Sequence, residues 1–307
     1  MSVIDPSLPW NDSQWSETSD NKWQAQLRRQ QAWWREKRLR MPAGSRVGHA
    51  RLVSSMLPDD VDLSTNLMWP EAVAAAENAL LALTTEGRPG LIQEERLRRN
   101  LLSSQPLCFN LFGYLGAHEH SLLSWVRTIQ PEAASIDDVR LEWAPATGAL
   151  GGSAFDAFVC YESRIGNRGF VGVEVKYAED LAAAHRKPAN DKYKIPTLAG
   201  SWKTGAVERL DRPKLRQFWY NQLLTQVVLA SGEYDEGFGA VVACAADHSA
   251  REVTASVAAE LTDPCGLRFS SIEDVVASVR GHDDWQIRFT ERYLTYAQRA
   301  GTMRQSD

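Results

Sequence analysis

The chain has few cysteines, and they stand far apart. Four cysteines in 307 residues are too few for a disulfide framework in a chain of this size, and no pair has the C-x-x-C spacing of a zinc site. We therefore expect small buried thiols at Cys108, Cys160, Cys244 and Cys265. The six histidines are scattered as well. Only His118 and His120 are close, and a spacing of two does not place them on one helical face, so a zinc site is not expected.

Long apolar runs are also missing. No stretch approaches the ~20 apolar residues needed to span a bilayer, which predicts no membrane partner. The N-terminal stretch MSVIDPSLPWNDSQWSE lacks the positive start and apolar core of a secretory signal, so we expect a cytoplasmic protein. Contents of 44% hydrophobic and 24% charged residues are ordinary for a globular chain.

The formal net charge of −5 argues against a uniformly basic nucleic-acid binder, but the charge is unevenly distributed. Residues 22–51 contain nine basic side chains against one acidic side chain, Glu36; the nine are Lys22, Arg28, Arg29, Arg35, Lys37, Arg38, Arg40, Arg46 and Arg51. This segment is therefore a candidate contact for a polyanion.

The N-terminal region, residues 1–65, is predicted to be an irregular arm followed by a basic, tryptophan-rich helix over residues 21–40. Trp23, Leu27 and Trp34 share one stripe of that helix. The favoured interpretation is a surface helix clamped to the body by its tryptophans. Two alternatives are contact with nucleic acid and docking of another subunit, for example in a homodimer.

Residues 66–307 are predicted to form the main domain. Residues 43–68 look like a connecting loop; helices are expected from Pro70, over 91–103 and, after an interruption at Pro106, over 107–129. At Val139 the hydrophobic period changes from about 3.6 to about 2, and VRLEWA, SAFDAFVCY and GFVGVEVKY form an expected three-strand meander.

After the meander, we expect a short helix over 178–187, a basic loop to residue 212, a helix over 213–230 and a buried strand over 237–246. The last section is predicted to be helical with one short strand near 267–269, ending in a helix near residue 300. This order describes an α/β protein with α/β/α layers around a mixed sheet.

Turn-centred pairing places acidic residues side by side. A turn near Ile165 sets Asp156 opposite Glu174, with Cβ atoms roughly 5 Å apart, and a turn near Ala149 sets Glu142 opposite Asp156. Carboxylates that close repel each other unless a proton or a cation compensates, so a divalent metal is expected between them.

Lys176 follows Glu174 by two residues, so strand alternation puts both on one face. Carboxylates that bind Mg²⁺, with a lysine that orients or helps deprotonate a water, suit phosphodiester hydrolysis. The alternative is a lattice of surface salt bridges. It is disfavoured because the intervening residues of both strands are strongly apolar.

These residues also resemble a known superfamily. RRNLLSSQPLCFNLFG, LEWAP, SAFDAFVCY and GFVGVEVKYAEDL, in this order, look like the restriction-endonuclease-like bacterial group of PD-(D/E)xK nucleases. The resemblance covers roughly residues 66–244 and implies an αβββαβ core with added terminal helices, Mg²⁺ or Mn²⁺ as cofactor and DNA as partner. It implies that Asp156, Glu174 and the backbone carbonyl of Val175 bind the metal and that Lys176 is catalytic. Phe155 replaces the nominal proline, which is not a ligand.

The resemblance leaves a rival interpretation: a catalytically idle nuclease fold that grips nucleic acid or a partner protein. Further candidates are weaker, and each has an ordinary structural alternative. They are Glu95 as a further ligand, Ser103, Ser104, Gln105 and Asn110 as cleft or capping residues, Tyr220, Gln222 and Gln226 as substrate contacts, and residues 22–40 and 186–203 as contacts to the nucleic-acid backbone.

Overall fold

The structure is a computed structural model and describes residues 15–86, 92–145, 150, 153–181 and 187–295. Its centre is a five-stranded mixed sheet in the order β3-β4-β5-β6-β7. The first three strands are antiparallel, and β5, β6 and β7 are parallel. The strands are β3 (Ala133–Trp143), β4 (Phe155–Ser163), β5 (Arg168–Val175), β6 (Glu236–Ala243) and β7 (Leu267–Ser271). The expected mixed sheet is confirmed.

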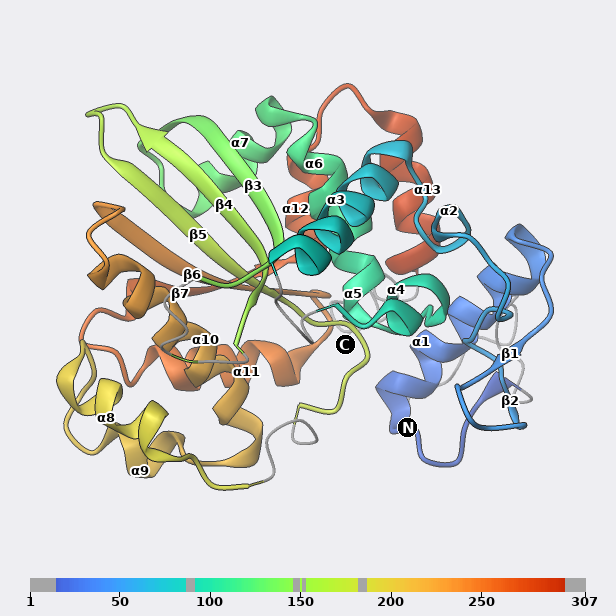
Figure 1. The fold of residues 1–307 in the computed structure, drawn as a ribbon, viewed down its shortest axis with the longest axis horizontal. Helices are drawn as coiled ribbons and strands as arrows, with labels where there is room; N and C mark the ends of the chain where they lie inside the picture. Colours follow the sequence, from blue (N-terminus) through green and yellow to red (C-terminus); the bar gives the residue numbers. More distant parts are fainter. Residues whose placement is uncertain (1–14, 87–91, 146–149, 151–152, 182–186, 296–307) are drawn as a thin grey trace, which may run out of the picture.

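Helices cover both faces of this sheet, as predicted (Figure 1). Strand alternation directs Val159 and Val173 to a core beneath α5, α7, α12 and α13, and Phe158 and Phe170 to a second core beneath α10 and α11. These helices are α5 (Ser104–Cys108), α7 (Glu119–Ile129), α10 (Pro213–Ala230), α11 (His248–Ala258), α12 (Ile272–Ser278) and α13 (Asp283–Tyr293). The α10 crossover joins the parallel strands β5 and β6.

Several remaining elements differ from those predicted by the hydrophobic periodicity of the sequence. The expected loop at 43–68 contains β1 (Gly44–Ser45), β2 (Leu52–Val53) and α2 (Leu63–Asn66); the expected helix at 91–103 shortens to α4 (Glu94–Arg99). The basic loop before residue 212 contains α8 (Asp191–Ala199) and α9 (Ala206–Leu210), because Tyr193, Trp202 and Leu210 are buried against the second core. Helices α3 (Pro70–Glu86) and α10 lie where predicted.

Two further expectations for helices fall partly outside the described residues. Of the helix expected over 178–187, Ala178–Leu181 is not helical, and residues 182–186 are outside the described part. Residues 296–300 of the last predicted helix are also outside the described part.

The helix predicted over 107–129 is divided. It contains a π-helical turn (Phe109–Gly113), α6 (Tyr114–Gly116) and α7, and the chain turns at His118 between α6 and α7. No helix among the described residues is long and apolar enough to cross a bilayer.

Helix α1 (Lys22–Trp33) is fixed to the body as expected. It begins at a capping box in which Asn21 and Gln24 exchange hydrogen bonds. The Trp23 indole donates to the Tyr177 carbonyl at 3.1 Å, and Leu27 is fully buried. The tryptophan clamp is therefore confirmed within one chain. The division of the chain at residue 65 stays a prediction.

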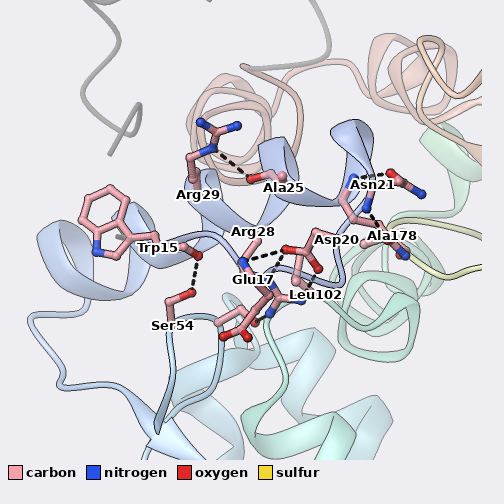
Figure 2. Close-up of polar contacts among 12 residues, drawn as sticks. Trp15, Glu17, Asp20, Asn21, Ala25, Arg28, Arg29, Ser54, Leu102 and Ala178 are labelled. Carbon is pink, nitrogen blue, oxygen red and sulfur yellow. Dashed lines mark hydrogen bonds and ion pairs between the residues drawn. The ribbon is translucent and has the colours of Figure 1, made fainter. Parts of the chain in front are cut away.

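The basic residues of this segment are not all free to bind a polyanion, in contrast to the sequence interpretation. Arg28 is buried and forms a paired contact with Asp20 at 2.6 and 2.8 Å (Figure 2). Arg35 is buried and donates to the Ser54 carbonyl. Both arginines therefore make contacts within the N-terminal segment itself. Similarly, Cys265 is exposed, whereas the other three cysteines are buried as predicted.

Arg292 is fully buried in the polar junction between α13, α1 and α2. It donates to the Asn66 carbonyl at 2.7 Å and also contacts the side chains of Asn66 and Gln31. Gln31 in turn donates to the Arg292 carbonyl at 2.8 Å. Burial lowers the pKa of the guanidinium, so these neutral oxygens stabilise a charge that has lost its water.

We expect Arg292→Ala to lower the free energy of unfolding by about 3 kcal/mol, because it leaves Asn66 and Gln31 with buried unpaired groups. Urea unfolding followed by circular dichroism measures this change. Arg288→Ala is the matched control on α13: Arg288 is exposed over the Trp69 ring, so its loss costs less than about 1 kcal/mol. Equal losses in the two variants would contradict the proposed role of the buried network.

Candidate active site

The observed register agrees with the turn-centred arithmetic. Leu141 pairs with Ala157, and Ala157 pairs with Val173. One residue further along each strand, the same register brings Asp156 to the level of Glu174. The carboxylates therefore gather at one end of β4 and β5, at the middle of the sheet.

Glu142 joins them through an irregular backbone. Its φ of +51°, in the left-handed region, is uncommon for a residue other than glycine. Glu142 lies between the pairs Leu141–Ala157 and Trp143–Phe155, at the level of Asp156. Its carboxylate accepts a hydrogen bond from the Gln105 amide at 2.7 Å. Gln105, at the start of α5, was among the residues predicted to cap the helices or line the cleft, and it contacts one of the three acids.

Asp156 is fixed by the neighbouring strand. Its Oδ2 accepts a hydrogen bond from the Val175 backbone N–H at 2.6 Å. The N–H and C=O of one strand residue point to the same side, so the Val175 carbonyl is directed toward Asp156 as well. Phe155 has a packing role in place of proline: its ring lies over Gly172, where an added Cβ would meet it at 2.3 Å.

Glu174 and Lys176 form a buried ion pair, and each side chain is 6% exposed. The Lys176 ammonium donates to Glu174 Oε1. Two amides of α10 complete the shell: Gln217 donates to Oε1 at 2.6 Å, and Asn221 donates to Oε2. Three charged or amide donors thus satisfy the oxygens of this buried carboxylate.

Burial and neighbouring charges raise the pKa values of Glu142 and Asp156. Burial raises the pKa of Glu142 to about 8; the Gln105 hydrogen bond opposes this, and the Glu174 charge adds to it. Burial, followed by the charges of Glu174 and Glu142, raises the pKa of Asp156 well above its usual range. Raised pKa values in a group of buried carboxylates indicate that a bound cation would stabilise their ionised forms.

The pKa of Lys176 is also raised, which for a lysine favours the charged form. Burial lowers its pKa, but the charges of Glu174, Glu179 and Asp156 outweigh that and raise it overall. Glu179 accepts from the backbone N–H groups of Ser104 at 2.7 Å and of Tyr177 at 2.9 Å. Lys176 is therefore an ammonium ion surrounded by carboxylates.

Most of the weaker sequence candidates lie elsewhere or have structural roles. Glu95 accepts from the Val47 N–H, Ser103 caps α5, and Asn110 bonds to Asn66 and Tyr293 in the core. On α10, the three predicted contacts have other partners than Glu174. Tyr220 stacks on Tyr193, Gln222 donates to the Gly266 carbonyl, and Gln226 accepts from Trp202.

Three residues around Glu174 and Lys176 were not predicted from the sequence: Gln217, Asn221 and Glu179. Gln217 and Asn221 are spaced i, i+4, which places them on one face of α10. The same spacing describes Gln222 and Gln226, so periodicity alone gives two amide faces and no means to choose. Only the rotation of α10 over the sheet decides which face meets Glu174.

A profile of the PD-(D/E)XK nuclease superfamily matches residues 18–295, nearly the whole chain. The chain belongs to this superfamily. No curated protein and no solved structure gave a significant match. Membership indicates nuclease activity in general, and with it an interaction with nucleic acid. The predicted fold class is confirmed by the same match and by the mixed sheet.

The donor set of this PD-(D/E)XK chain fits a hard divalent cation. Glu142, Asp156 and Glu174 offer carboxylate oxygens, and the first two have raised pKa values that a cation between them would relieve. Among the described residues, no three acidic, histidine or cysteine side chains are already arranged as a ligand set. The amides of Gln217 and Asn221 and the Lys176 ammonium occupy the oxygens of Glu174.

We expect stability to fall as pH rises. The raised pKa of Glu142 means that the folded metal-free protein binds a proton more tightly than the unfolded chain does. Its contribution is present below the usual glutamate range and is lost as pH rises to about 8. Added Mn²⁺ competes with that proton, so its stabilising effect grows over the same window. Melting temperatures measured across this range, with and without Mn²⁺, test both trends.

Glu142→Gln removes the carboxyl group that binds this proton, so it should reduce the slope of melting temperature against pH. Glu162→Gln, an exposed change at the far end of β4, is the matched control and should keep the parent slope. A parent-like slope in Glu142→Gln would show that Glu142 is not the group responsible.

Proposed function

We propose that this chain is a divalent-metal-dependent nuclease that hydrolyses phosphodiester bonds in DNA, in defence against foreign DNA or in DNA processing. The observation that carries the proposal is the buried Lys176–Glu174 pair next to Asp156 in a PD-(D/E)XK chain. Three carboxylates and one ammonium in a shielded position cost stability, and a catalytic role explains their presence.

In this proposal, Asp156, Glu174 and the Val175 carbonyl bind Mg²⁺ or Mn²⁺, and Glu142 is the fourth acid. The bound metal would lower the pKa of a water and neutralise charge on the phosphate. The Asp156–Val175 hydrogen bond supports this assignment, because it holds the Asp156 carboxylate of β4 against β5, the strand of Glu174 and Val175.

Lys176 acts as a donor rather than as a base. Its pKa is raised, so it remains an ammonium ion at neutral pH and has no lone pair to accept a proton. We assign it to orienting the attacking water and stabilising negative charge on the phosphate oxygens. Of the two roles that the sequence left open for this lysine, this favours the first.

One observation favours the rival function, a nuclease fold that binds nucleic acid without cutting it. The oxygens of Glu174 are already bonded to Lys176, Gln217 and Asn221, as they would be in an idle site that binds nucleic acid without cutting it. Calorimetric titration with Mn²⁺ separates the two, because an active site has to exchange these donors for metal. Submillimolar binding favours the nuclease, and no binding favours the idle module.

Asp156→Asn and Lys176→Ala should each lower the rate of DNA cleavage by on the order of 10²-fold or more, because one removes a ligand charge and the other a charge donor. The assay incubates linear, circular, single-stranded and double-stranded DNA with Mg²⁺ or Mn²⁺. Glu162→Gln is the control of unchanged rate. A parent that cuts no form, or variants that cut as well as the parent, would refute the assignment.

Asn221→Ala should lower the cleavage rate by about tenfold, because Glu174 loses a charge-assisted donor. Gln226→Ala is the control on the same helix: it faces Trp202 and should leave the rate near that of the parent. Mn²⁺ affinity measured on both variants identifies a positioning role, since only Asn221→Ala should change it. A parent-like metal affinity and rate in Asn221→Ala would exclude that role.

A further inference from the structure

A cavity of about 250 Å³ lies between α1, β2, α4 and the residues that follow β5, Ala178–Asp180. Its wall includes Ser103, which caps α5, and Glu179, whose charge acts on Lys176. The cavity therefore adjoins the candidate active site. Its volume is below the ~300 Å³ at which pockets for drug-sized ligands begin, so it suits a small group.

Two arginines, Arg46 and Arg96, line this cavity. Both are exposed, and within the described part of the chain neither guanidinium forms an ion pair. A third arginine in the wall, Arg28, is neutralised by Asp20 (Figure 2). The acids that line it are Glu179, whose oxygens accept two backbone N–H groups, and Asp180.

Arg46 is set in place by α4, which also carries Arg96. The preceding residue, Ser45, accepts a hydrogen bond from buried Arg99 through its carbonyl. The following residue, Val47, donates its N–H to Glu95 at 2.9 Å. Both neighbours of Arg46 are thus bonded to the same helix, so the backbone of Arg46 is held beside the helix that carries Arg96.

The other opening at the carboxylates has the opposite charge. A groove of about 980 Å³ between α3 and β3 ends at Glu142 and is lined by Glu71, Glu119, Asp137 and Asp138 as well. Its one arginine, Arg140, is paired with Asp138 at 2.6 Å. A polyanion is repelled there and attracted on the side of Arg46 and Arg96.

We propose that Arg46 and Arg96 bind one backbone phosphate of the nucleic acid next to the bond that is cut, and so fix the strand on the α4 side of the site. This inference rests on the proposed function for the position of the cut bond. Guanidinium groups bind phosphate oxygens in two-pronged contacts, which gives orientation as well as attraction.

The test measures binding of a fluorescent DNA oligonucleotide, with Ca²⁺ in place of Mg²⁺, by Arg46→Gln, Arg96→Gln and the double variant. The double variant should bind about tenfold more weakly, and the slope of log affinity against log salt should fall by about 1. Arg164→Gln is the matched control, since that exposed arginine lies at the turn between β4 and β5. Affinity for Mn²⁺ should be that of the parent in every variant.

A methylphosphonate scan then locates the phosphate. One neutral linkage should weaken binding to the parent and cause no extra loss in the double variant, and its place in the strand distinguishes an internal phosphodiester from a terminal phosphate. Parent-like binding by the double variant, or a loss equal to that of Arg164→Gln, would overturn the inference.

The two proposals fail separately. A parent that cleaves DNA, with a double variant that binds and cleaves as the parent does, would leave the nuclease assignment and remove the phosphate site. A parent that binds DNA through these arginines but cuts no form would leave the phosphate site and remove the nuclease. A parent that binds no DNA overturns both.

Discussion

The buried pair of Glu174 and Lys176 is the constraint on which the site depends. Moving two charges out of water costs several kcal/mol per ion, and their mutual attraction compensates only when further hydrogen bonds complete the shell. Gln217 and Asn221 provide those bonds from α10. The crossover helix therefore has two tasks: it joins the parallel strands β5 and β6, and it stabilises the charge at the end of β5. A different rotation of α10 would leave Glu174 without its donors.

The same concentration of charge that weakens the fold gives the site its chemistry. Glu142 and Asp156 have raised pKa values because burial and neighbouring carboxylates oppose their ionisation. Apolar side chains of similar size at these positions would make the fold more stable, so stability alone does not explain the buried carboxylates. The left-handed backbone at Glu142 supports the same conclusion, because uncommon backbone conformations are found mainly where they serve a function.

The N-terminal segment contributes to the site through the residues that follow Lys176. Trp23 and Gln24 of α1 donate to the carbonyls of Tyr177 and Ala178, so the chain leaves β5 along a fixed path. The Asp20–Arg28 pair and the contact between Ser54 and Trp15 secure the same region (Figure 2). The basic residues of 22–51 thus include buried arginines that stabilise the fold, Arg28 and Arg35, and an exposed one, Arg46, that lines the cavity next to Glu179.

Local patterns in the sequence determined the meander, its register and the grouping of Asp156, Glu174 and Glu142, because alternation and short turns fix which residues meet across neighbouring strands. They also determined α3 and α10, whose long periodic stretches start at proline. Only the tertiary structure decided which face of α10 meets Glu174, that Glu95 bonds to Val47, and that α8 and α9 form in the basic loop. These outcomes depend on contacts between residues far apart in the chain, and no local period encodes such contacts.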